Sequence, residues 1–168
     1  MRSTTSYPRV SIKSYRPLAE AAIARSIDVG MELSLRRPDS ARRDCGLLGE
    51  LAASLYLFHN ADPWFQARNR QYEKRSTPDL YPYTGLEIKT LCDPSHRRAP
   101  VDHMFRNDVH TFYVRFSEDN TFEMIGWLRA AQAQAIWQLG QTTFADGWRF
   151  IPVECLTPAE TCPWRVES

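Results

Sequence analysis

The sequence predicts a mixed α/β fold, in which helices flank a central mixed β-sheet. Three observations support this class. Apolar residues recur at helical spacing before residue 60, and short runs that alternate between apolar and polar residues follow after residue 85. The chain has 168 residues, of which 43% are hydrophobic and 24% charged, as is ordinary for one globular domain with a sizeable core.

Two helices are expected before the strands. Residues 17–27 carry apolar residues at helical spacing, with Pro17 in the first turn and Gly30 ending the segment. Asp44 can cap a second helix, whose apolar stripe is formed by Leu47, Leu48, Leu51, Ala52, Leu55 and Phe58. Another side of this helix carries the small residues Gly46, Gly49 and Ala53. Small residues let a neighbouring element approach closely, so we expect this helix to be covered on two sides.

Five later runs have the composition and alternation of strands. They are residues 77–80, 85–91, 111–116, 121–127 and 148–153. A helix rich in Ala and Gln is expected at 128–139, and irregular structure after Pro158. At the other end, residues 1–16 are expected to form an extended basic arm, which leaves residues 17–168 as a single domain.

Composition excludes several classes of protein. No apolar run approaches the roughly 20 residues that a membrane-spanning helix needs, and the polar N-terminus lacks the apolar segment of a signal peptide. A cytoplasmic location with no membrane partner is therefore expected. Cys45, Cys92, Cys155 and Cys162 show neither CxxC nor zinc-finger spacing, which favours four free thiols. A disulfide between Cys155 and Cys162 is the alternative.

Charge is unevenly distributed along the chain, although the net charge is only +1. Residues 1–43 hold nine Lys and Arg against four Asp and Glu, whereas residues 117–168 hold three against seven. A basic first part suits a polyanionic partner such as nucleic acid. A solvated N-terminal arm explains the same distribution equally well.

The run Leu86-Glu87-Ile88-Lys89 has a pattern that suggests chemistry. Successive side chains of a strand point to opposite faces, so Leu86 and Ile88 share the face that can enter a core. Glu87 and Lys89 then project together from the other face. Asp79 lies upstream across a turn, and a hairpin would bring it beside Glu87.

Two carboxylates and an ammonium group at one point suit metal-assisted hydrolysis of a phosphodiester. Mg²⁺ prefers oxygen ligands, and it lowers the pKa of a bound water. Lys89 could orient that water and stabilise negative charge in the transition state. Each part has a simpler explanation, because Glu-x-Lys is a common exposed ion pair and Pro-Asp is a turn signal. The combination is more specific than its parts.

Pro78-Asp79 followed by Glu87-Ile88-Lys89 resembles the signature of the PD-(D/E)xK nuclease superfamily, which includes restriction endonucleases and Holliday-junction resolvases. Residues 46–50 (GLLGE) are similar to the family's preceding helix, where a glutamate contributes to the metal site. The runs 112–114 and 125–127 are similar to the strands that follow the motif. The resemblance covers roughly residues 44–130, and it implies a restriction-endonuclease-like αβββαβ core with the active site at one edge of the sheet.

The resemblance also implies roles for individual residues. Asp79 and Glu87 would be metal ligands, Lys89 would assist the general base or orient the water, and Mg²⁺ or Mn²⁺ would be the cofactor. Glu50 would be a further ligand, directly or through water. The residues alone leave Glu50 open between this role and a plain solvated helix glutamate, because it lies off the apolar stripe.

Basic residues on either side of the motif are candidates for contact with nucleic-acid phosphates. They are Arg68, Arg70, Lys74, Arg75, Arg97 and Arg98. For those that precede the motif, a solvated basic loop is the alternative. The loop from Cys92 to Asn107 leaves directly from the candidate catalytic strand, and its Asp102-His103 pair suggests another base, although most such histidines are structural or exposed.

These features together predict a Mg²⁺-dependent endonuclease that hydrolyses DNA. A chain this short, without a second recognition domain, would act as a homodimer or as a subunit of a larger assembly. Two alternatives are a non-catalytic nucleic-acid-binding or assembly protein that keeps the nuclease fold, and a metal hydrolase of small phosphoesters. The clustered carboxylates argue against the first alternative, because phosphate binding needs positive charge.

Overall fold

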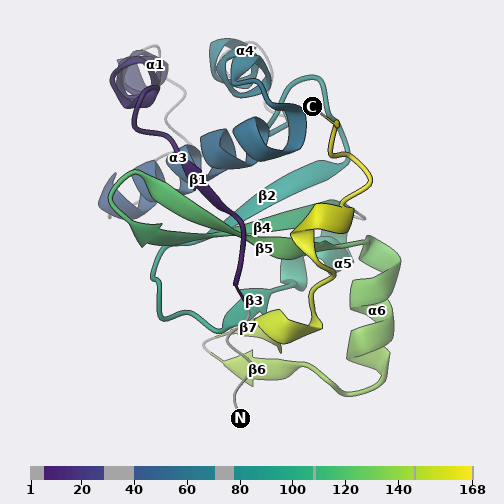
Figure 1. Cartoon of the computed structure of the whole chain (residues 1–168). Coiled ribbons are helices and arrows are strands. Elements are labelled where there is room, and N and C mark those ends of the chain that lie inside the picture. Colours follow the sequence, from purple (N-terminus) through teal and green to yellow (C-terminus); the bar gives the residue numbers. More distant parts are fainter. Residues whose placement is uncertain (1–5, 29–39, 71–77, 108, 146, 168) are drawn as a thin grey trace.

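The computed structural model describes residues 6–28, 40–70, 78–107, 109–145 and 147–167 (Figure 1). The helices are α1 (Arg16–Asp28), α3 (Ser40–Phe58), α4 (Asp62–Arg70), α5 (Asp102–Asn107) and α6 (Ala130–Gln138). The strands are β1 (Arg9–Ser11), β2 (Leu86–Leu91), β3 (Arg98–Pro100), β4 (His110–Glu118), β5 (Thr121–Leu128), β6 (Thr143–Ala145) and β7 (Trp148–Pro152). Two short 3₁₀ turns follow, η1 (Val153–Cys155) and η2 (Ala159–Thr161).

The strands form two sheets. The larger has the order β1-β5-β4-β2, in which β2 runs parallel to β4 while β5 is antiparallel to both of its neighbours. The smaller sheet, β3-β7-β6, is antiparallel throughout. The expected mixed sheet with flanking helices is therefore confirmed, and β2 is an outermost strand among the described residues.

Both faces of the larger sheet are covered (Figure 1). Helices α1, α3 and α4 enclose one core, and α5, α6 and the small sheet enclose the other. Strand β4 serves both cores by simple alternation, since Phe112 and Val114 face the first and Tyr113 faces the second.

Helix α3 is covered on two sides, as its small residues predicted. Leu51 and Leu57 are both fully buried, and the indole Nε1 of Trp64 on α4 donates a hydrogen bond of 2.8 Å to the Leu47 carbonyl oxygen. The opposite contact is with β2. A Cβ atom on Gly49 would lie 2.1 Å from Thr90 Oγ1, so this crossing needs a residue without a side chain.

Several expected elements are confirmed with small shifts in their ends. These are the helices at 16–28 and 130–138 and the strands at 86–91, 110–118, 121–128 and 148–152. None of the four cysteines, all of which lie in the described residues, forms a disulfide, as expected. None of the helices within the described parts of the chain combines the length and apolarity that a membrane crossing requires.

Other expectations are corrected by the structure. Helix α3 begins at Ser40, so Asp44 lies inside the helix and pairs with Arg43 at 3.0 Å instead of capping it. Residues 78–80 form a bend where a strand was expected, and residue 77 lies outside the described residues. The αβββαβ order is therefore not confirmed. Gly30 also lies outside the described residues.

Five elements were not predicted: β1, α4, β3, α5 and β6. Residues 9–11, inside the expected N-terminal arm, form strand β1 and pair with β5. Asp62 and Pro63 begin helix α4, since proline is well suited to the first helical turn. The side chain of Asn60 supports this start by accepting a hydrogen bond of 2.9 Å from the Asp62 N–H.

Candidate active site

Strand β2 displays its side chains as the alternation predicted. Leu86 and Ile88 are 3% and 4% exposed and join the core beneath α3. Glu87 and Lys89 share the opposite face, where both are partly exposed and Lys89 Nζ lies 2.6 Å from Glu87 Oε1. The charged pair is therefore presented at an outermost strand of the sheet, within reach of solvent.

Asp79 reaches this strand without a hairpin. Its Oδ2 accepts a hydrogen bond of 2.8 Å from the backbone N–H of Ile88. The Asp79 side chain thus satisfies a backbone N–H on the open edge of β2, which a further strand could otherwise bond. Leu80 is fully buried and anchors the bend that carries Asp79. The expected proximity of Asp79 to the Glu87 strand is present, although the expected route to it was wrong.

Arg68 joins two other segments to this edge. It lies on α4, is 2% exposed, and packs its guanidinium carbon 5.5 Å from the ring centroid of Trp64. Its Nη1 lies 3.2 Å from Glu50 Oε2 on α3, and its Nη2 donates a hydrogen bond of 3.3 Å to the carbonyl oxygen of Asp79. Glu50 is therefore directed inward, toward the Asp79 segment, and is not a solvated helix glutamate.

The carboxylates at this edge oppose one another electrostatically. Burial raises the pKa of Glu50 well above its usual range, and the nearby Asp79 and Glu87 carboxylates raise it further against the effects of Arg68 and Lys89. Burial likewise raises the pKa of Asp79, while the hydrogen bond from Ile88 lowers it. An added cation would relieve this repulsion, which is a typical property of functional sites.

The donor chemistry fits a divalent cation. Glu50 Oε2 is at ion-pair distance from Arg68, yet the angle does not make a hydrogen bond, so this buried oxygen has no hydrogen-bond partner. Glu50, Asp79 and Glu87 together offer the all-oxygen ligand set that Mg²⁺ and Mn²⁺ prefer. Among the residues that the structure describes, no three acidic, His or Cys groups already stand at metal-ligand spacing. Lys89 and Arg68 pair with the carboxylates instead.

His103 lies beside the site on the face of the sheet that α5 covers. Its Nε2 is 2.8 Å from Thr111 Oγ1, and Thr111 is the β4 residue in register with Glu87. Burial lowers the pKa of His103 to about 4, so the imidazole is neutral at pH 7. The carboxylate of Asp102 accepts a hydrogen bond from the backbone N–H of Arg149, and its charge raises the pKa of His103 by less than burial lowers it.

The structure separates the basic residues that precede the motif. Arg68 lies in the interior and pairs with Glu50, so the alternative of a solvated basic loop is wrong for this residue, while its contact with a phosphate stays a prediction. Arg70 is partly exposed, and its guanidinium stacks 4.2 Å from the ring centroid of Tyr81. Lys74 and Arg75 lie outside the described residues.

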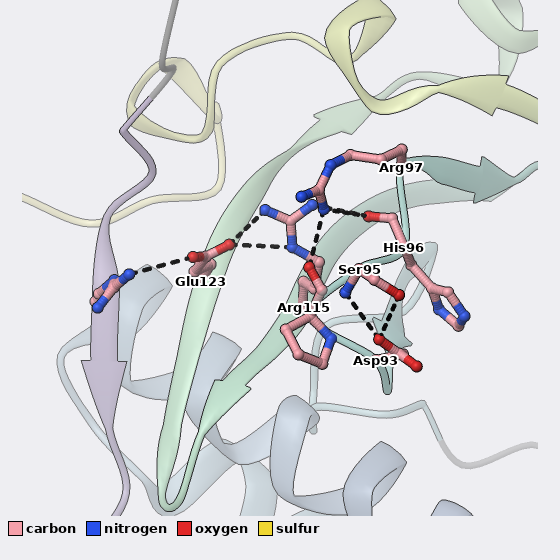
Figure 2. Close-up of polar contacts among 8 residues, drawn as sticks. Asp93, Ser95, His96, Arg97, Arg115 and Glu123 are labelled. Carbon is pink, nitrogen blue, oxygen red and sulfur yellow. Dashed lines mark hydrogen bonds and ion pairs between the residues drawn. The ribbon is translucent and has the colours of Figure 1, made fainter.

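The loop after β2 is held by a polar network (Figure 2). Arg115 on β4 donates two hydrogen bonds to Glu123 and one of 2.8 Å to the carbonyl oxygen of His96. Arg97 is exposed and donates to carbonyl oxygens of its own loop, including that of Pro94 at 2.9 Å. Exposed Arg98 follows at the start of β3. Arg97 and Arg98 therefore remain available to solvent on a fixed loop.

The partnership between Arg68 and Glu50 was missed from the sequence. Arg68 follows Trp64 by four residues, and this spacing places both on one face of a helix. Trp64 is fully buried, so a helix beginning at Asp62 would have predicted a buried Arg68. No helix was predicted at residues 62–70, so this spacing was not used.

Comparisons with protein-family models, curated proteins and solved structures give no match. The geometry described above therefore carries the functional argument.

Proposed function

We propose that this chain is a divalent-metal-dependent endonuclease of the PD-(D/E)xK type that hydrolyses phosphodiester bonds in DNA. The observation that carries the proposal is that the carboxylates of Glu50, Asp79 and Glu87 interact electrostatically with one another and with Lys89 at the outer edge of β2. Among them, Glu50 has a buried oxygen without a hydrogen-bond partner. Such a group is costly in a fold unless it serves a ligand.

A bound Mg²⁺ or Mn²⁺ would supply an activated water and would neutralise charge on the phosphate. Glu50, Asp79 and Glu87 would hold the ion. Lys89, which is 34% exposed at its side chain, would donate hydrogen bonds to the attacking water or to a phosphate oxygen. Arg68 would position Glu50 and the Asp79 backbone relative to each other, because it contacts both.

The arrangement of segments supports the PD-(D/E)xK plan. The helix that carries Glu50 packs directly on the strand that carries Glu87 and Lys89, through Gly49 and Thr90. Asp79 approaches the same strand from its open edge. The restriction-endonuclease-like core remains part of the proposal, since the strand expected at residues 78–80 is a bend.

The test is cleavage of circular single-stranded DNA and supercoiled plasmid in the presence of Mg²⁺ or Mn²⁺. Circles have no ends, so cutting them reports endonuclease activity. We expect cleavage that requires the metal and is lost in Asp79→Asn and Glu87→Gln. Asp119→Asn, in the exposed turn between β4 and β5, is the matched control and should cleave normally. A folded wild-type protein that cuts neither circle with either metal would refute the proposal.

A second candidate is a nucleic-acid-binding or assembly protein that keeps this fold without catalysis. The pairing of Lys89 with Glu87 and of Arg68 with Glu50 favours it, because each carboxylate already has a cationic neighbour. This candidate predicts that Mn²⁺ leaves the melting temperature unchanged and enables no cleavage. A hydrolase of small phosphoesters would instead turn over a simple diester such as bis(p-nitrophenyl) phosphate and fail to bind DNA.

A further inference from the structure

The small sheet β3-β7-β6 has one buried and one open face. Ala99 pairs with Ile151 across β3 and β7, and both are fully buried in the second core. The neighbouring positions of each strand therefore point away from that core. By this register the open face carries Arg98, Pro100, Thr143, Ala145, Trp148, Phe150 and Pro152, and all of these residues are exposed or half-buried.

Two aromatic rings lie on this open face. Trp148 is 51% exposed, and Phe150 is half-buried with the Arg98 guanidinium 5.3 Å from its ring centroid. The rings of Trp148 and Phe150 and the Arg98 guanidinium are planar groups on which another planar group can stack. Nucleobases are such groups, and their stacking on aromatic side chains tolerates any sequence.

The charge on this sheet is complementary to a polyanion. The open face carries Arg98, Arg97 is exposed immediately before β3, and the three strands contain no acidic residue. The other arginine of these strands, Arg149, lies on the opposite face with Phe144. Asp102 lies beside these strands, but its carboxylate is engaged by the Arg149 N–H. A second copy of the chain, docked here about a two-fold axis, would set this basic face against itself, which like charges disfavour.

We propose that the open face of β3-β7-β6 binds single-stranded nucleic acid, with bases stacked on Trp148 and Phe150 and phosphates contacted by Arg97 and Arg98. This inference rests on the proposed function in taking nucleic acid as the ligand, and it assigns a second contact surface for the substrate strand. The hydrogen bond from Arg115 to the His96 carbonyl oxygen ties the loop before Arg97 to β4 (Figure 2), and the same loop leaves directly from β2, which carries the candidate catalytic pair.

The test measures binding of a fluorescein-labelled oligo(dT) of about 16 nucleotides by fluorescence anisotropy, in EDTA, so that neither metal nor cleavage enters. We expect Trp148→Ala to weaken binding about tenfold. Arg98→Ala should weaken it and reduce the slope of log affinity against log salt by about 0.7. Phe144→Ala is the matched control, because Phe144 is 69% exposed on the same sheet but in register with Arg149 on the other face. Its binding should equal that of the wild type.

Duplex binding and light scattering distinguish a single strand from a duplex or a second copy of the chain as the partner of this face. The effect of Trp148→Ala should be confined to single strands, because bases in a duplex are already stacked, and an equal loss on a duplex would overturn the stacking role. Unchanged oligo(dT) binding in Trp148→Ala would also overturn the proposal, as would a wild-type dimer that this variant dissociates in light scattering. Because the assay contains no metal, it measures oligo(dT) binding independently of cleavage. The nuclease proposal can therefore fail while this binding proposal holds.

Discussion

Two buried arginine–glutamate pairs in this chain are satisfied in different ways. Arg115 holds Glu123 through two hydrogen bonds of 3.0 and 2.6 Å and also bonds the His96 carbonyl oxygen (Figure 2). Arg68 lies 3.2 Å from Glu50, but neither Arg68 Nη1 nor Glu50 Oε2 has a hydrogen-bond partner. The two glutamates are almost equally exposed, at 15% and 14% of the side chain, so burial does not explain the difference.

The difference supports the proposal that the Arg115–Glu123 pair is structural and the Arg68–Glu50 pair functional. A fully bonded pair fixes the fold, and here it fixes strands β4 and β5 and the loop at His96. The Arg68–Glu50 pair retains unused bonding capacity, and both burial and two neighbouring carboxylates raise the pKa of Glu50. Local arrangements that cost stability are expected where a protein binds its ligand.

The largest expected effect is on catalysis at the edge of β2, where Lys89 lies near the Arg68–Glu50 pair. Lys89→Ala should reduce DNA cleavage by about 10²–10³-fold, because it removes the group placed to stabilise transition-state charge. The fold should survive, since the Lys89–Glu87 pair is partly exposed and such pairs contribute little to stability. Single-turnover cleavage rates measure this, with Lys13→Ala, an exposed lysine, as control. Wild-type rates in Lys89→Ala would remove Lys89 from the mechanism.

The next effect is on stability and compares the two pairs directly. Glu123→Ala should lower the free energy of unfolding by about 3 kcal/mol, because Arg115 would be left buried without its carboxylate. Glu50→Ala should lower it by less than about 1 kcal/mol, because Arg68 keeps the nearby Asp79 and the repulsion among carboxylates is relieved. Urea unfolding at neutral pH measures both. Equal losses would contradict the distinction between the pairs.

A smaller effect is expected where α3 crosses β2. Gly49→Ala would place a methyl group against Thr90 and should cost about 1–3 kcal/mol, while shifting the adjacent Glu50 and slowing cleavage. Gly46→Ala is the matched control, because no atom lies within 4 Å of the position that its methyl group would take, and it should stabilise the helix by up to about 1 kcal/mol. Thermal melts and cleavage rates test both. A neutral Gly49→Ala would show that the crossing can widen freely.

Local patterns allowed part of the fold and of the site to be predicted. The alternation in Leu86-Glu87-Ile88-Lys89 predicted which side chains enter the core, because a strand has a period of two whatever its partners are. The small residues of α3 predicted its second contact surface for a similar reason, since close packing depends on side-chain size. The mixed sheet followed from the same patterns.

Features that depend on distant partners could not be predicted in this way. Asp79 reaches β2 by a side-chain hydrogen bond to Ile88, and no local pattern distinguishes that from a hairpin. The spacing of Arg68 from Trp64 could have indicated that Arg68 is buried, but its partner Glu50 lies on another helix and could not be identified from the local pattern. Strand β1 is three residues long and acquires its structure from pairing with β5.

The most direct test of the central claim is isothermal titration of Mn²⁺ into the wild type, Glu50→Ala and Glu123→Ala. If the unsatisfied carboxylate at the edge of β2 is a ligand, the wild type and Glu123→Ala bind Mn²⁺ with the same affinity, and Glu50→Ala binds at least about tenfold more weakly. No heat of binding in the wild type, or equal affinity in all three proteins, would contradict the assignment of this edge as a metal-dependent site.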